Sequence, residues 1–169
     1  MADSKLVGLL IEAWKDFDRV LDGLDPSLAV QNLDGGSSFA WTLGHVTNQV
    51  DSMISVRFRK QDSHELIAQE RFRFGGTGVA EDWPAIQAGV SEVRDAVLRY
   101  LNNVSDQDLE VIVPYDGSIS YLRETGLGLR YALFRIITHH YFHIGEISTK
   151  RDRIGHQVGD YPGPLLESL

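Results

Sequence analysis

Four long segments of the chain carry apolar residues at the three- and four-residue spacing of an amphipathic helix, and this pattern constrains the fold more than any other feature. The segments run over residues 4 to about 24, 38 to about 60, 82 to about 102 and 125 to about 154. Each such helix must bury its apolar stripe against other elements. The sequence therefore predicts an all-α fold, a four-helix bundle formed by a single domain over residues 1–169.

Capping residues mark the expected helix ends. Ser37 or Ser38 can cap the second helix, Asp82 stands just before the Trp-Pro start of the third, and Thr125 can cap the last. We expect the last helix to stop near Gly155, because glycine can adopt a left-handed conformation without strain. These residues set the boundaries that a structure can test.

The connections between the helices are unequal. Residues 61–81 show no sustained period, which predicts a long crossover that lets the third helix run parallel to the second. Residues 111–115 and 119–121 alternate around Asp116-Gly117, a pattern typical of a small hairpin or paired extended segment before the last helix. Residues 156–169 retain apolar side chains, so we expect an ordered tail whose role the sequence leaves open.

Composition excludes several classes of function. Sixteen basic and 24 acidic residues give a net charge of -8, which disfavours nucleic acid and anionic membranes as partners. The chain has no cysteine, so thiolate metal sites, cysteine nucleophiles and disulfides are ruled out. No window approaches the roughly 20 apolar residues of a membrane-spanning helix, and no signal peptide is evident, so we expect a cytoplasmic protein.

Three of the six histidines fall within five positions of the last helix. His139 and His143 lie about 40° apart on one helical face, which suits two imidazoles that share one metal ion. His140 points about 100° away from His139, so we do not expect it to be a ligand of the same ion. An i,i+4 pair alone is equally compatible with hydrogen-bonded core histidines.

His45 is the candidate third ligand, because it lies near the apolar side of the second helix, where a facing helix could meet the pair. Three neutral imidazoles leave positions open for water or substrate, as catalytic metal sites do. Glu146 falls about 20° from His139 on the same helix and is the candidate catalytic residue. It could be a further ligand, a partner of a ligand imidazole or a general base, or simply a surface carboxylate paired with Lys150.

Two segments resemble the metal motifs of DinB-like proteins of the DinB/YfiT superfamily: TLGHVTNQVD at residues 42–51 and HHYFHIGEI at residues 139–147. The resemblance implies that the metal ligands are His45, His139 and His143 and that the cofactor is a divalent ion, with zinc or nickel favoured. It also implies a homodimer and, by analogy with the better understood relatives, transfer or isomerisation reactions that use low-molecular-weight thiols. The family often has glutamine at the position of Glu146.

Two functions follow as hypotheses. The first is a metal-dependent enzyme, a transferase or hydrolase, that activates a thiol or water for reaction on a small-molecule substrate. The alternative is a non-catalytic stress-response or interaction protein, a dimeric helical bundle whose histidines pack in the core or bind metal adventitiously. Apolar residues on nearly all sides of the last helix also favour a homodimer. Arg71 and Arg73 could hold an acidic substrate, although solvated loop charges are the more ordinary interpretation.

Overall fold

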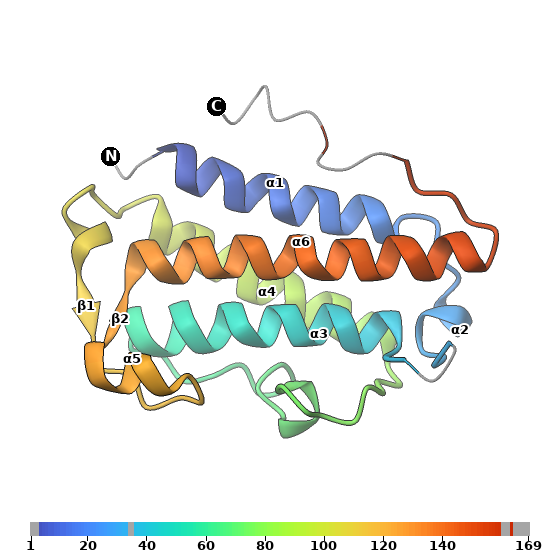
Figure 1. Cartoon of the computed structure of the whole chain (residues 1–169), viewed down its shortest axis with the longest axis horizontal. Coiled ribbons are helices and arrows are strands. Elements are labelled where there is room, and N and C mark those ends of the chain that lie inside the picture. Colours follow the sequence, from blue (N-terminus) through green and yellow to red (C-terminus); the bar gives the residue numbers. More distant parts are fainter. Residues whose placement is uncertain (1–3, 34–35, 160–162, 164–169) are drawn as a thin grey trace.

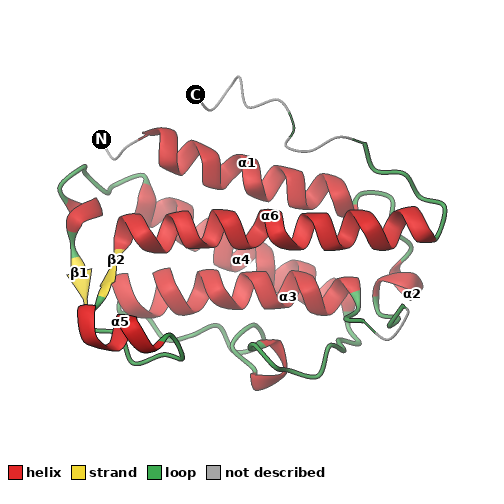
Figure 2. Cartoon of the chain, in the orientation of Figure 1, coloured by secondary structure: helices red, strands yellow, loops and turns green. Residues whose placement is uncertain are grey.

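The computed structural model describes residues 4–33, 36–159 and 163, and four long helices dominate it (Figures 1 and 2). They are α1 (Ser4–Leu21), α3 (Phe39–Val50), α4 (Trp83–Leu101) and α6 (Leu129–Arg153). A π-helical stretch, Asp51–Phe58, continues α3 without a break. The predicted all-α bundle is confirmed.

The long connection sets the direction of the helices. In Figure 1, α3 and α4 run in one direction, while α1 and α6 run in the other. α1 packs along α6, and α3 packs against both α4 and α6. After the π-helical stretch, the crossover to α4 contains a short 3₁₀ turn at Glu70–Phe72. The fully buried side chains of Ile67 and Phe72 anchor this crossover to the bundle. The predicted crossover is therefore confirmed.

Two of the predicted N-caps occur in the structure. The hydroxyl of Ser38 accepts a hydrogen bond from the backbone N–H of Trp41 at 3.1 Å, and the carboxylate of Asp82 accepts one from Ala85 at 3.0 Å. A third cap of this kind was not predicted: Asp25 begins the short helix α2 (Pro26–Ala29), again just before a proline. The helix α6 ends before Gly155, whose φ is 79°, as the sequence predicted.

The segment before α6 differs in detail from the prediction. The strands β1 (Ile112–Val113) and β2 (Leu127–Gly128) pair antiparallel, so the paired extended segment is confirmed but its second strand is not residues 119–121. Those residues enter a short helix, α5 (Ser120–Thr125), that buries Leu122. Thr125 therefore ends α5 and does not cap α6, because Gly126 at φ 80° turns the chain into β2 first.

Most of the apolar residues of α6 are covered within the single chain. Leu133, Ile136, Ile137, Ile144 and Ile147 are buried, and the half-buried Tyr141 donates its hydroxyl hydrogen to Asp16 of α1 at 2.9 Å. Phe134 remains 59% exposed and Phe142 71% exposed. The homodimer therefore stays a prediction, supported by these two phenylalanines and no longer by the whole helix.

Within the described part of the chain, no helix combines the length and the apolar character that a bilayer crossing requires. Of the tail at residues 156–169, only 156–159 and 163 belong to the described residues. The backbone N–H of Gly163 donates to Asp16 of α1 at 3.0 Å. The other residues of the tail lie outside the described residues.

A glycine pair tests how tightly the crossover packs. A Cβ at Gly44 of α3 would press into the fully buried ring of Phe72, whereas a Cβ at Gly145 of α6 would meet nothing within 4 Å. We expect Gly44→Ala to lower the free energy of unfolding by about 1–3 kcal/mol through overpacking. Gly145→Ala should raise it by up to about 1 kcal/mol, because alanine favours the helix. Urea denaturation measures both, and equal effects would contradict the packing described.

Candidate metal centre

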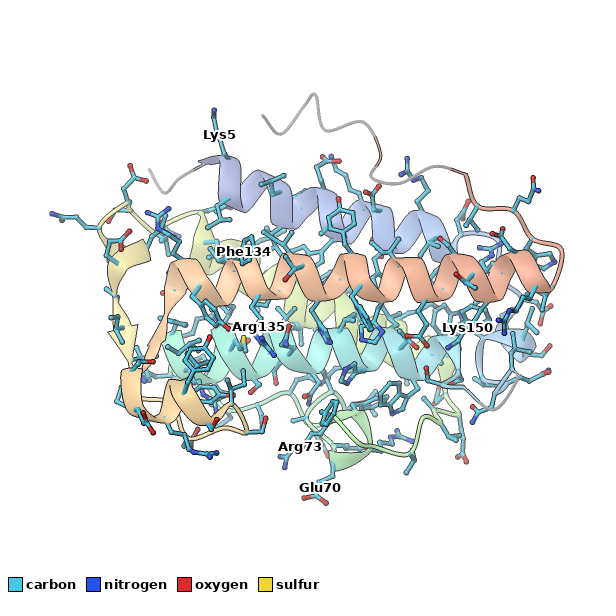
Figure 3. All side chains as sticks on the ribbon, viewed as in Figure 1. Lys5, Glu70, Arg73, Phe134, Arg135 and Lys150 are labelled. Carbon is cyan, nitrogen blue, oxygen red and sulfur yellow. The ribbon has the colours of Figure 1, made fainter. Side chains whose placement is uncertain are left out.

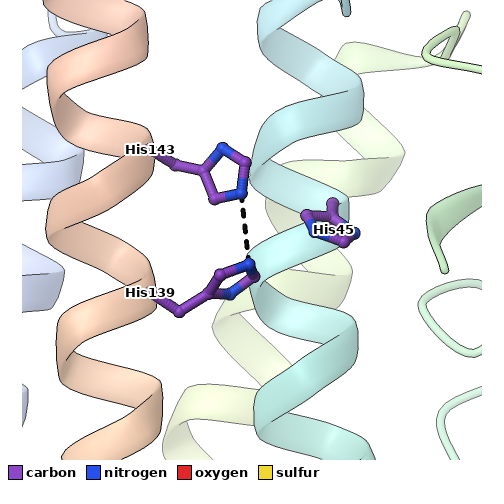
Figure 4. Close-up of side chains that lie close together, drawn as sticks. All are labelled: His45, His139 and His143. Carbon is purple, nitrogen blue, oxygen red and sulfur yellow. Dashed lines mark hydrogen bonds between the residues drawn. The ribbon is translucent and has the colours of Figure 1, made fainter. Parts of the chain in front are cut away.

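Three imidazoles from two helices meet between α3 and α6 (Figure 4). His45 comes from α3, while His139 and His143 lie one turn apart on α6. One nitrogen from each ring can be chosen so that all three lie within 4.8 Å of one another. The structure thus brings together the three residues that the sequence proposed as ligands, across almost 100 positions of chain.

A hydrogen bond and a stacking contact orient the ring of His45. Its Nδ1–H donates to the backbone carbonyl of Phe72 at 2.6 Å, and the ring stacks on Trp41 with centroids 4.6 Å apart and planes 8° from parallel. Trp41 in turn donates its indole N–H to the carbonyl of Arg71 at 2.5 Å. The crossover therefore fixes the tautomer of His45 and leaves its Nε2 lone pair for another partner.

His143 is oriented by Glu146. Its Nδ1–H donates to the Glu146 carboxylate at 2.7 Å, because an ionised carboxylate can only accept. The other carboxylate oxygen accepts from the Ser37 hydroxyl at 2.9 Å and forms an ion pair with Lys150. The hydrogen bond from His143, followed by the hydrogen bond and charge of Lys150, lowers the pKa of Glu146 to about 2 despite its partial burial.

His139 is held neutral by its surroundings. Burial, followed by the neighbouring histidines, lowers the pKa of His139 to about 3, and burial also lowers the pKa of His45. The Nε2 of His139 lies 3.2 Å from the Nε2 of His143, which accepts its hydrogen. The Nδ1 of His139 is buried and has no hydrogen-bond partner among the described residues. Moving the hydrogen of His139 from Nε2 to Nδ1 would break the hydrogen bond to His143 and leave Nε2 with a free lone pair.

The donor set fits a divalent ion. Zinc binds imidazole nitrogen at about 2.0–2.1 Å, and two nitrogens 3.2 Å apart can both lie at that distance from one ion. Neutral imidazoles are ligands that zinc and nickel accept readily. The hydrogen bonds from His45 to Phe72 and from His143 to Glu146 match the outer partners that ligating histidines normally have.

His140 lies outside this cluster, as its helical register predicted. It is fully buried on the side of α6 that faces α1, where its ring packs edge-on against Phe17 with centroids 5.5 Å apart. Its Nδ1–H donates to the carbonyl of Ile136 at 2.8 Å. His140 is thus a core histidine, although it is adjacent in sequence to His139.

Three contributors to the site have weak signals in the sequence. Ser37 carries only the signal of a helix cap in the sequence, but its hydroxyl donates a hydrogen bond to Glu146. Phe72 contributes its backbone carbonyl oxygen, which no side-chain pattern reveals. Trp41 carries no metal-ligating atom, and it contributes by stacking on His45. Arg73 is exposed, and its Nη1 lies 3.7 Å from Oε1 of Glu70, as expected of a solvated loop charge. The guanidinium carbon of Arg71 lies 4.9 Å from the centre of the Phe72 ring.

Comparisons with known proteins agree with this architecture. A family model described as the DinB superfamily matches residues 9–147. A crystal structure of a conserved protein from Enterococcus faecalis superposes with a TM-score of 0.69 at 16% identity, covering 92% of this chain and 99% of the other. A DinB-like protein from Bacillus cereus superposes with a TM-score of 0.59 at 18% identity, covering 90% and 95%. No curated protein sequence matches the chain.

Acid sensitivity of the metal-free protein tests the burial of His140. Burial lowers the pKa of His140 to about 3, whereas an unfolded histidine titrates near 6.5. Between these pH values the unfolded chain binds a proton that the folded chain does not, so stability falls as the pH drops. We expect His140→Leu to reduce that fall by roughly 1 kcal/mol per pH unit, as measured by urea denaturation at several pH values. Parallel curves for the variant and the unaltered protein would contradict the burial.

Proposed function

The chain belongs to the DinB superfamily, and on that premise we propose that it is a metal-dependent enzyme that activates a thiol or a water molecule for transfer or hydrolysis on a small molecule. His45, His139 and His143 hold the metal, with zinc or nickel as the favoured ions. The observation that carries the proposal is the convergence of these three imidazoles, two of which have hydrogen-bonded Nδ1 atoms that leave Nε2 for an ion.

The composition of the cluster supports an open, catalytic site rather than a closed structural one. Structural zinc sites are filled by four protein ligands, commonly with thiolates, whereas three protein ligands leave room for a reactant. A divalent ion supplies the chemistry by lowering the pKa of a bound water or thiol into the physiological range. Because the chain has no cysteine, a thiol must come from a small molecule.

Glu146 serves this site by positioning His143. Its pKa of about 2 makes it a weak proton acceptor near neutral pH, which disfavours the role of general base. Its three partners, His143, Ser37 and Lys150, hold the carboxylate in one orientation and in the ionised form. We assign it the role of orienting the imidazole and strengthening its Nε2 as a donor.

The wider setting of the proposal follows the sequence. We propose a homodimer in the cytoplasm with a small-molecule substrate, since the net charge of -8 disfavours nucleic acid. The exposed Phe134 and Phe142 on α6 support the dimer, because large exposed apolar side chains favour interfaces. Light scattering at micromolar concentration tests this part of the proposal, and a monomer would refute it.

Two neighbouring histidines provide the test of the metal site. His139→Ala should lower the affinity for zinc by orders of magnitude, because one of three ligands is lost. His140→Ala should leave that affinity within a few-fold, because His140 faces α1 and bonds only to Ile136. Isothermal titration with zinc measures both, and circular dichroism confirms that each variant is folded. Equal loss of affinity in the two variants would contradict the ligand assignment.

Activity distinguishes the enzyme from a non-catalytic bundle. The zinc- and nickel-loaded protein is screened with low-molecular-weight thiols and small electrophiles, and with ester and amide substrates for hydrolysis. We expect turnover that His139→Ala abolishes and His140→Ala retains. Stoichiometric metal binding without any turnover across both sets would favour the non-catalytic alternative.

A further inference from the structure

His64 caps a single helical turn, residues 65–68, in the crossover between α3 and α4. The crossover lies along α3, where Figure 3 labels Glu70 and Arg73. The backbone N–H of Ile67 donates to Nδ1 of His64 at 3.2 Å, and the N–H of Ala68 donates to its carbonyl at 2.9 Å. These are the bonds of an N-cap, a position that serine, threonine, aspartate or asparagine usually fills. An imidazole in this role gives the crossover a cap that can titrate.

The two hydrogen bonds of the His64 ring fix its protonation state. Because a backbone N–H can only donate, Nδ1 accepts from Ile67 and carries no hydrogen. Nε2 lies 3.1 Å from a carboxylate oxygen of Glu92, which accepts its hydrogen. The ring is therefore the neutral Nε2–H tautomer. A proton on Nδ1 would turn this acceptor into a donor, and the bond from Ile67 would be lost.

The surroundings keep the ring in place in either state. A Cβ at Gly89 of α4 would lie 3.0 Å from Cε1 of His64, so this glycine leaves room for the ring. Glycine is unfavourable inside a helix, and the close approach explains its presence. Both charged side chains bonded to His64 are acidic: Glu92 of α4 binds the ring, and Asp51 accepts the backbone N–H at 2.9 Å. A protonated ring would therefore stay beside these carboxylates while the turn loses its cap.

Hydrogen bonds connect the capped turn to the metal site. The carbonyl of Ile67 accepts from the side-chain amide of Asn48 at 2.8 Å, one helical turn after His45 on α3. The chain continues in turns to Phe72, whose N–H donates to the carbonyl of Gln69 at 3.0 Å. The carbonyl of Phe72 in turn accepts the Nδ1–H of His45 at 2.6 Å. The cap therefore supports the segment that orients one ligand ring.

We propose that His64 is a proton-sensitive positioning residue: its neutral ring holds the crossover that orients His45, and protonation of the ring releases that hold. Histidine is the side chain that ordinarily changes its charge between about pH 5 and 8. The consequence for metal binding rests on the function proposed above, whereas the release of the crossover does not. Mild acid would then weaken the site in two ways, because protons also compete with the metal for the ligand nitrogens.

Two substitutions at position 64 imitate the two states. In His64→Asn the side-chain oxygen replaces Nδ1 as the acceptor of an ordinary N-cap, and this amide does not titrate. In His64→Ala the acceptor is absent at every pH. The first variant should therefore keep the crossover held in acid, and the second should release it even at neutral pH.

NMR of the metal-free protein follows the amide of Ile67 and the ring Nδ1–H of His45 from pH 7.5 to 5.5. In the unaltered protein, the protection of the Ile67 amide, corrected for the intrinsic exchange rate, should fall about fivefold, because one net hydrogen bond is lost. The His45 signal should change with it. In His64→Asn the protection should stay constant, and in His64→Ala it should be low throughout.

Zinc affinity provides a pH profile that a merely structural role would not change. At pH 7.5, isothermal titration should give His64→Asn the affinity of the unaltered protein and His64→Ala an affinity about fivefold lower, if the hydrogen bond is fully coupled to the site. At pH 5.5 the unaltered protein should bind as weakly as His64→Ala and more weakly than His64→Asn. The ligand histidines are identical in all three proteins, so their own protonation cancels in these ratios.

The control is His156→Asn, the same substitution at an exposed histidine beyond α6. It should keep the full pH response of the unaltered protein. An equal fall of Ile67 protection in His64→Asn, or a His45 signal that does not follow the Ile67 amide, would overturn the proposal. If the unaltered protein binds no zinc, the proposed function fails, and the two metal-free NMR signals still decide the role of His64.

Discussion

The packing of α6 against α3 is the contact on which the rest of the site depends. It places His45 opposite His139 and His143, although almost 100 residues separate them along the chain. α6 also packs along α1, and buried apolar residues such as Leu133, Ile136 and Ile147 line the helix. Because an ordinary apolar core holds the helices in place, the site need not supply the energy of folding. The imidazole nitrogens are therefore not needed to hold the helices together.

Burial and hydrogen bonding determine the protonation of the site together. Desolvation keeps His139 and His45 neutral, which is the form that binds a metal. A partly buried Glu146 carboxylate without a partner would be unfavourable beside these rings, but the charge of Lys150 and the hydrogen bond from Ser37 compensate it. The result is two oriented imidazoles, those of His45 and His143, within a cluster that carries little net charge. An ion or an anionic reactant would then dominate the local field.

The crossover between α3 and α4 is part of the site and not merely a connection. Its backbone supplies the carbonyl of Phe72 to His45 and that of Arg71 to Trp41, while the Phe72 ring fills the space above Gly44. The side-chain amide of Asn48 donates to the carbonyl of Ile67 at 2.8 Å and ties the same segment to α3. The three hydrogen bonds give the long segment a definite path, because each satisfies polar groups that the bundle would otherwise leave unpaired.

Periodicity and spacing predicted the four helices and the shared face of His139 and His143, since these features depend on local geometry. The length of the connection at residues 61–81 predicted the parallel course of α3 and α4. The same helical register predicted that His140 points away from the face shared by His139 and His143. Other features depend on contacts between segments that are distant in the sequence, so only the tertiary structure determined them. Residues 120 and 121 belong to a short helix, in which Leu122 is buried, and not to a strand. Glu146 has Ser37 and Lys150 as partners because α6 passes the start of α3.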